Sequence, residues 1–187
     1  MIHYKLYLKN PHSHYIYVDL TIDAVSSPSL ELQLPAWRPG RYELGNFAKN
    51  VKRVDVFDEN DKPLVYQKST KDLWVIETNG AKKIKVTYSY HTTEINAGNC
   101  YADETQLYVN PVHLCLYVPA RMQEEHTLEL DIPENYKVAT SLKKVNKNFV
   151  ASSFDELADS QIMSSASLQS DFYEVNGSKV WLYFIGV

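Results

Sequence analysis

The chain opens with Ile2-His3-Tyr4-Lys5-Leu6-Tyr7-Leu8-Lys9, in which every second residue (Ile2, Tyr4, Leu6, Leu8) is apolar. This two-residue period is typical of a β-strand that buries one face. After the turn formers Asn10-Pro11-His12-Ser13, residues 14–23 repeat the alternation, with Ile16, Val18, Leu20 and Ile22 on one side. The two segments therefore predict an antiparallel hairpin joined by a short turn.

The rest of the chain continues as short strands separated by turns. Leu30, Leu32 and Leu34 mark a third strand, which Pro35 ends. Further strands are expected over residues 51–57, 64–67, 73–77, 83–91, 106–118, 126–132, 136–140, 149–153, 171–175 and 180–185. Only residues 43–50 and 155–165 suit a helical turn. The sequence therefore predicts an all-β fold, either an antiparallel β-sandwich or a twisted β-saddle.

Length and charge restrict the classes of partner. A chain of 187 residues without a low-complexity linker or internal repeat predicts one β domain over residues 1–187. Its 19 basic and 23 acidic residues give a net charge of -4, so no basic field attracts nucleic acid or an anionic membrane. No run of residues has the apolar length of a membrane span, and we expect a cytoplasmic protein.

Metal-ligand and nucleophile patterns are sparse. His12 and His14 have a spacing that metals use, but local sequence fixes no third or fourth ligand. Cys115, in the apolar run Leu114-Cys115-Leu116, reads as a reduced, buried residue, and Cys100 lies in a polar stretch. Neither a Gly-x-Ser-x-Gly elbow nor a glycine-rich phosphate loop is present. We therefore predict no catalytic residue and no cofactor in this chain.

The segment Trp37-Arg38-Pro39-Gly40-Arg41-Tyr42 predicts a stiff loop, because Pro35 and Pro39 bracket its first two residues. In one interpretation Trp37, Arg38 and Tyr42 wall a groove that orients a peptide. In the other, the two aromatic residues fill one end of the core and the arginine pairs with an acid. The sequence leaves both interpretations open.

Asp103 and Glu104 lie in a polar loop between two expected strands. Loops on a rigid β scaffold often carry binding residues, and this acidic pair could meet the ammonium group of a peptide. A solvated loop explains the same two residues. They are therefore candidates for a peptide groove together with the Trp37 segment.

Several segments in order carry a family resemblance. These are Leu34-Pro35-Ala36-Trp37-Arg38-Pro39-Gly40-Arg41-Tyr42, residues 101–116, Phe154-Asp155-Glu156-Leu157-Ala158-Asp159-Ser160 and residues 175–186. Together they resemble the N-terminal, non-catalytic domain of the glycyl aminopeptidase family. Those zinc metallopeptidases also carry a thermolysin-like catalytic domain and a PDZ domain. One departure is Gln161, where the family usually has proline.

The resemblance implies a β domain that packs on its own catalytic domain and borders a cleft for the peptide substrate. Zinc is then expected in that catalytic domain, because its His-Glu-x-x-His pattern occurs nowhere in this sequence. An apolar face near the Trp37 loop and the chain end would mark the domain contact and allow a weak dimer. The alternative is a free-standing β-sandwich that binds carbohydrate or peptide, a reading that rests on the tyrosine and tryptophan content.

Overall fold

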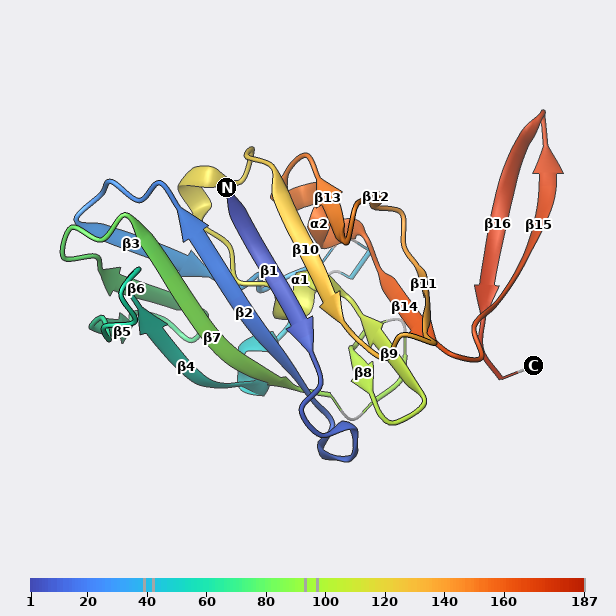
Figure 1. The fold of residues 1–187 in the computed structure, drawn as a ribbon, viewed down its shortest axis with the longest axis horizontal. Helices are drawn as coiled ribbons and strands as arrows, with labels where there is room; N and C mark the ends of the chain where they lie inside the picture. The colour runs from blue at the N-terminus through green and yellow to red at the C-terminus, as the bar shows by residue number, and fades with distance from the viewer. Residues whose placement is uncertain (39, 42, 93, 97, 187) are drawn as a thin grey trace.

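The computed structural model describes residues 1–38, 40–41, 43–92, 94–96 and 98–186, and most of them lie in strands or the turns between strands (Figure 1). The largest sheet has seven strands in the order β12-β13-β10-β1-β2-β7-β4. Their bounds are β1 Ile2–Tyr7, β2 Tyr15–Asp23, β4 Val51–Phe57, β7 Lys83–His91, β10 His126–Asp131, β12 Lys143–Val145 and β13 Asn148–Ala151. The predicted all-β fold is confirmed.

Two smaller sheets and a separate hairpin contain the other strands. One sheet has the order β3-β6-β5 and the other β11-β14-β9-β8, while β15 and β16 pair with each other and with no other described strand. The bounds are β3 Ser29–Gln33, β5 Tyr66–Lys68, β6 Leu73–Glu77, β8 Tyr101–Ala102, β9 Gln106–Val109, β11 Lys137–Ala139, β14 Ile162–Ser165, β15 Gln169–Val175 and β16 Ser178–Phe184. The helical segments are short: η1 Pro11–Ser13, η2 Phe47–Asn50, α1 Pro111–Leu114, η3 Pro119–Arg121 and α2 Phe154–Asp159.

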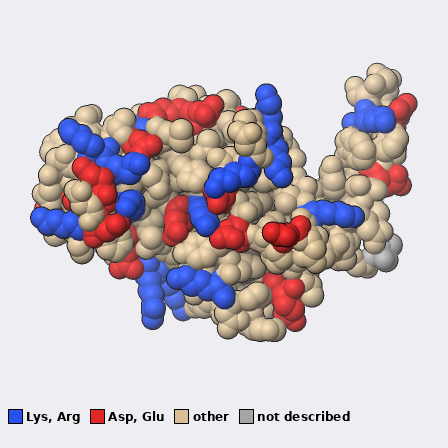
Figure 2. All heavy atoms as spheres, in the orientation of Figure 1, with Lys and Arg blue, Asp and Glu red and all other residues tan. Residues whose placement is uncertain are grey.

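The core lies between the large sheet and the segments behind it in Figure 1. In β1 and β2 buried and half-buried residues alternate strictly, so each strand turns one face inward. The other face of the large sheet carries interspersed basic and acidic side chains, as Figure 2 shows. Lys5, for example, lies 2.9 Å from the carboxylate of Asp131 on the neighbouring strand. The sheet therefore has one apolar and one solvated face, which is the pattern predicted for residues 2–23.

Two buried tyrosines connect the large sheet to the segment behind it. The Tyr4 hydroxyl donates a 2.8 Å hydrogen bond to the carbonyl of Leu116. The Tyr88 hydroxyl donates to the carbonyl of Leu114 at 2.7 Å and accepts from the Leu116 amide at 3.1 Å. Because Leu114 to Leu116 lie outside any strand or sheet ladder, these hydroxyls satisfy backbone groups that would otherwise be buried without partners. Gln33 and Tyr117 add an isolated bridge that links the same segment to β3.

Several strand predictions are wrong, and each error has a local or a tertiary cause. The strand expected over 106–118 stops at Val109, because Pro111 begins the helix α1. The segments 51–57 and 64–67 meet at their turn, where the Leu64 amide donates a 2.9 Å hydrogen bond to the Val56 carbonyl, but their ladder partners differ, since β4 pairs with β7 and β5 with β6. One strand pair is not antiparallel: β1 and β10 run parallel. The strands β8, β12 and β14 were not predicted, and β14 occupies the second half of the segment 155–165 that was expected to suit a helical turn.

The hairpin predictions at the two chain ends are correct. β1 pairs antiparallel with β2, from Ile2 opposite Ile22 to Tyr7 opposite Tyr17. The strands expected over 171–175 and 180–185 correspond to β15 and β16, which form a hairpin around Asn176-Gly177, where both turn residues have positive φ, as a two-residue turn requires. The last hairpin projects away from the rest of the molecule in Figure 1. No helix among the described residues is long and apolar enough to cross a membrane.

Candidate functional site around the Trp37 loop

An apolar groove of about 290 Å³ lies between the Trp37 loop, α1 and α2. Trp37 is 46% exposed along it, so this side chain does not fill the core. Tyr117 and Phe154 form part of the lining, with their rings stacked at 4.4 Å between centroids. Because Tyr117 is also bridged to Gln33 through two backbone hydrogen bonds of 2.8 Å, the groove wall is fixed to the sheet β3-β6-β5.

The helix α2 places two carboxylates beside this groove. Ser153 caps the helix by accepting a hydrogen bond from the Glu156 amide, and the Glu156 carboxylate returns to the Ser152 amide at 2.6 Å. This arrangement satisfies backbone donors that the start of a helix leaves free. Asp155 and Asp159 are exposed and line the groove. The groove thus combines an apolar wall with negative charge, a combination that suits an ammonium group beside an apolar side chain.

Arg38 follows Trp37 but faces a different part of the molecule. A β-carbon built on Gly98 would lie 3.2 Å from a terminal nitrogen of Arg38 and 3.7 Å from one of Arg41. The two guanidinium groups therefore converge on the backbone of Gly98, where a larger residue would crowd them. Arg41 is paired with Glu43, whereas Arg38 has no ion pair and its buried Nε has no hydrogen-bond partner within the described residues.

His113 lies close to these arginines and was missed as a site residue. It falls in the strand expected over residues 106–118, but it is fully buried on α1 and stacks on Phe47 at 4.1 Å. Neither ring nitrogen has a partner within the described part of the chain. Burial, together with the charges of Arg38 and Arg41, lowers its pKa to about 4. The ring is therefore neutral at pH 7, and its place within an apolar run was the only sequence signal of burial.

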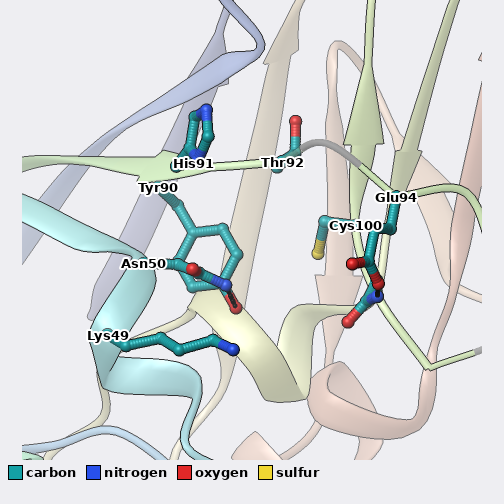
Figure 3. Close-up of a pocket in the computed structure, with 8 residues that line it drawn as sticks. Lys49, Asn50, Tyr90, His91, Thr92, Glu94 and Cys100 are labelled. Atoms are coloured by element: carbon teal, nitrogen blue, oxygen red, sulfur yellow. Dashed lines mark hydrogen bonds between the residues drawn. The ribbon is translucent and has the colours of Figure 1, made fainter.

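A polar pocket of about 110 Å³ lies beyond Phe47, between η2, the end of β7 and the loop before β8 (Figure 3). Lys49 lines it and makes no ion pair within the described ranges. Asn99 donates a 2.7 Å hydrogen bond to the Glu94 carboxylate, and Asn50 donates to the Tyr90 hydroxyl at 3.2 Å. Figure 3 shows the Lys49 side chain extending along this pocket.

Both cysteines are free and buried, which confirms the predicted reduced state. Cys100 lines the polar pocket, and burial raises the pKa of its thiol to about 12. Such a thiol is protonated at neutral pH and is a poor nucleophile. The described residues hold no group of three or more His, Cys, Asp or Glu side chains that could bind a metal ion.

The acidic candidates lie in a different hairpin. Asp103 closes the turn between β8 and β9 by accepting hydrogen bonds from the amide and hydroxyl of Thr105, from the Gln106 amide and from the Tyr101 hydroxyl. Burial raises the pKa of Asp103, but these hydrogen bonds outweigh it and lower the pKa overall. Glu104 is exposed and lies 3.4 Å from His12. No contact between described residues joins either acid to Trp37 or Arg38, and Tyr42 lies outside the described residues.

Comparison with known proteins decides the family. The model of the peptidase M61 N-terminal domain matches residues 3–166. The chain belongs to the peptidase M61 family. This result confirms the resemblance to the N-terminal domain of a metallopeptidase, and it favours that interpretation over a free-standing binding module.

Solved structures agree with the M61 assignment. The whole chain matches 33% of an aminopeptidase N family protein from Idiomarina loihiensis, with 26% identity and a TM-score of 0.90. An M1 zinc metallopeptidase from Deinococcus radiodurans matches 97% of the chain over 46% of its own, with 10% identity and a TM-score of 0.51, so it shares the fold. No curated protein matches the sequence. The M61 chain thus spans a third to a half of the length of these two proteins.

Proposed function

We propose that this chain is the non-catalytic N-terminal domain of a zinc-dependent aminopeptidase and that its Trp37 face borders the peptide cleft of the catalytic domain. The family match over residues 3–166 supports the first part. The observation that supports the second part is the half-exposed Trp37 beside an unpaired Arg38. A thermolysin-like domain with zinc and a PDZ domain elsewhere in the full-length protein belong to the same proposal.

Zinc itself does not fit the residues of this domain. A zinc site needs three or four His, Cys or carboxylate ligands, and the described residues bring no such group together. The role that remains for this chain is to bind and orient the peptide substrate. A rigid aromatic wall excludes water from one side of a peptide, and fixing the peptide lowers the entropic cost of reaching the reactive geometry.

Two kinds of charge near the Trp37 loop suit a short peptide. Asp155 and Asp159 beside the groove would attract a free amine, and Arg38 offers donors to a carbonyl or carboxylate. Because Trp37 lines the apolar groove while the adjacent Arg38 approaches Gly98, the two residues would contact different parts of one substrate. This division of contacts makes the proposal testable one residue at a time.

The test is the specificity constant of the full-length enzyme on glycyl and alanyl peptides. Trp37→Ala and Arg38→Ala should each lower kcat/KM by about tenfold, with circular dichroism and zinc content unchanged. The matched control is Lys9→Ala, because Lys9 lies over the Tyr17 ring on the outer face of the large sheet. Unchanged kinetics in both loop variants would mean that the domain serves as a scaffold and does not contact the substrate through this loop.

A second measurement concerns the isolated chain. It should not hydrolyse these peptides even with added zinc, because it contains neither a metal-ligand group within the described residues nor a recognisable nucleophile and base. Chelator-sensitive turnover by the pure isolated chain would contradict the assignment as a non-catalytic domain.

A further inference from the structure

The hairpin β15–β16 exposes an unusual amount of apolar surface. Seven of its large apolar residues are between 37% and 51% exposed: Phe172, Tyr173, Val175, Val180, Trp181, Leu182 and Tyr183. In Figure 1 the hairpin stands away from the sandwich, and Figure 2 shows only a few charged side chains on it. Isolated two-stranded hairpins are marginally stable in water. We therefore expect other polypeptide to cover this surface in the native protein.

The strand register divides these residues between two faces, because residues directly opposite each other in an antiparallel pair lie on the same face. Phe172 pairs with Trp181, and Tyr183 lies two residues further along the same strand. The ring contacts agree, with centroid distances of 5.1 Å from Phe172 to Trp181 and 6.4 Å from Trp181 to Tyr183. These three residues form the aromatic face of the hairpin.

The opposite face, termed the aliphatic face, carries Val175, Val180 and Leu182 together with the rings of Tyr173 and Phe184. Tyr173 pairs with Val180, and Leu182 lies two residues beyond Val180 on that side. The hairpin β1–β2 is different, because only one of its faces is apolar and the other is half-buried and charged. Strands that are apolar on both faces are typical of sheets covered on both sides.

The family match indicates what covers the hairpin. The match to the M61 N-terminal domain stops at residue 166, just before β15. Leu168, the last residue buried in the sandwich region before the hairpin, lies at this boundary, and its carbonyl accepts from Lys137 at 3.3 Å. The Idiomarina loihiensis protein nevertheless matches the whole chain, hairpin included, and is about three times as long. The fold of the hairpin is thus retained in a longer chain, which contains further polypeptide that could cover it.

We propose that β15 and β16 are strands of the catalytic domain's own sheet, covered on both the aromatic and the aliphatic face by the polypeptide that follows residue 187. This inference rests on the proposed function for the identity of that domain. The N-terminal domain then ends near Leu168, and the hairpin fixes the catalytic domain to it covalently. The single β domain expected over residues 1–187 becomes a domain of about 168 residues and the first element of the next.

Hydrogen exchange of the isolated chain and of the full-length protein tests this directly. Amides of β15 and β16 should exchange at least about a hundredfold more slowly in the full-length protein, because covered strands open only with their domain. Amides of β1 and β2 are the internal control and should be protected in both proteins. Equal exchange of the hairpin in the two proteins would overturn the proposal.

Charged substitutions test each face separately. Trp181→Asp on the aromatic face and Leu182→Asp on the aliphatic face should each lower the Tm of the full-length protein by about 5 °C or more. Neither should change the Tm of the isolated chain. The control is Val145→Asp, since Val145 is 43% exposed on β12 at the edge of the large sheet. An effect of only one hairpin variant would contradict coverage on both faces.

A second copy of the chain is the competing occupant. In that case the isolated chain would dimerise, and Trp181→Asp would dissociate the dimer. If, in addition, the hairpin amides of a monomeric full-length protein still exchange fast, the proposal is wrong. Because these readouts are exchange and stability, they do not depend on activity. Failure of the proposed peptide cleft would appear in the kinetics of Trp37→Ala and Arg38→Ala and would leave the hairpin results unchanged.

Discussion

Replacing His113 by phenylalanine should make the stability of the isolated chain less sensitive to acid. His113 is fully buried, and its pKa falls from the ordinary 6.5 to about 4 because burial and the nearby Arg38 and Arg41 disfavour the charged ring. A lowered pKa in the folded state means that the unfolded chain binds a proton first as the pH falls. The contribution of the neutral His113 ring to the free energy of unfolding is therefore complete above about pH 6.5 and is lost as the pH falls towards 4.

The size of the effect follows from these two pKa values. A difference between 6.5 and about 4 corresponds to at most about 3 kcal/mol, of which about 2 kcal/mol is lost between about pH 7.5 and pH 5. Phenylalanine keeps a ring against Phe47, whose centroid lies 4.1 Å from that of His113, but it cannot bind a proton. The variant should therefore lose about 2 kcal/mol less than the wild type over this pH range.

Urea unfolding followed by circular dichroism at the two pH values measures this difference. His126 is also buried with a lowered pKa, but it contributes to both proteins and cancels in the comparison. His12→Phe is a suitable control, because His12 is a histidine on the exposed η1 turn. Equal losses of unfolding free energy in His113→Phe and wild type would refute the argument that His113 is held neutral in the fold.

Three further substitutions test other parts of the structure. Tyr88→Phe should cost about 1–3 kcal/mol in urea unfolding, because the Leu116 amide then loses its buried acceptor; a neutral substitution would mean that water replaces the hydroxyl. Arg121→Ala should cost about 1–2 kcal/mol, since the guanidinium donates both to a carboxylate and to a backbone carbonyl, and Arg121→Lys should recover only part of this; full recovery by lysine would contradict a bidentate role. Gly98→Val should displace the Arg38 guanidinium and lower kcat/KM of the full-length enzyme as much as Arg38→Ala does. Wild-type kinetics in Gly98→Val would show that the position of Arg38 beside Gly98 does not matter for activity.

The sequence by itself determined the all-β class, the two terminal hairpins and the family. The alternation in residues 2–9 and 14–23 is a local property, because successive side chains of a strand always point to opposite faces. A buried face is thus visible without knowing what covers it. The order of segments around Trp37-Arg38-Pro39-Gly40 likewise identified the peptidase family before any geometry was known.

Only the tertiary structure decided which strands are neighbours and where the candidate side chains point. The parallel pairing of β1 with β10 joins residues more than a hundred positions apart, and no local period specifies such a partner. Trp37 lines the apolar groove and the adjacent Arg38 approaches Gly98, while Asp103 accepts hydrogen bonds within its own turn. The burial of His113 depends on Phe47 and on two arginines from another loop, so its neutral charge state is a product of packing rather than of sequence pattern.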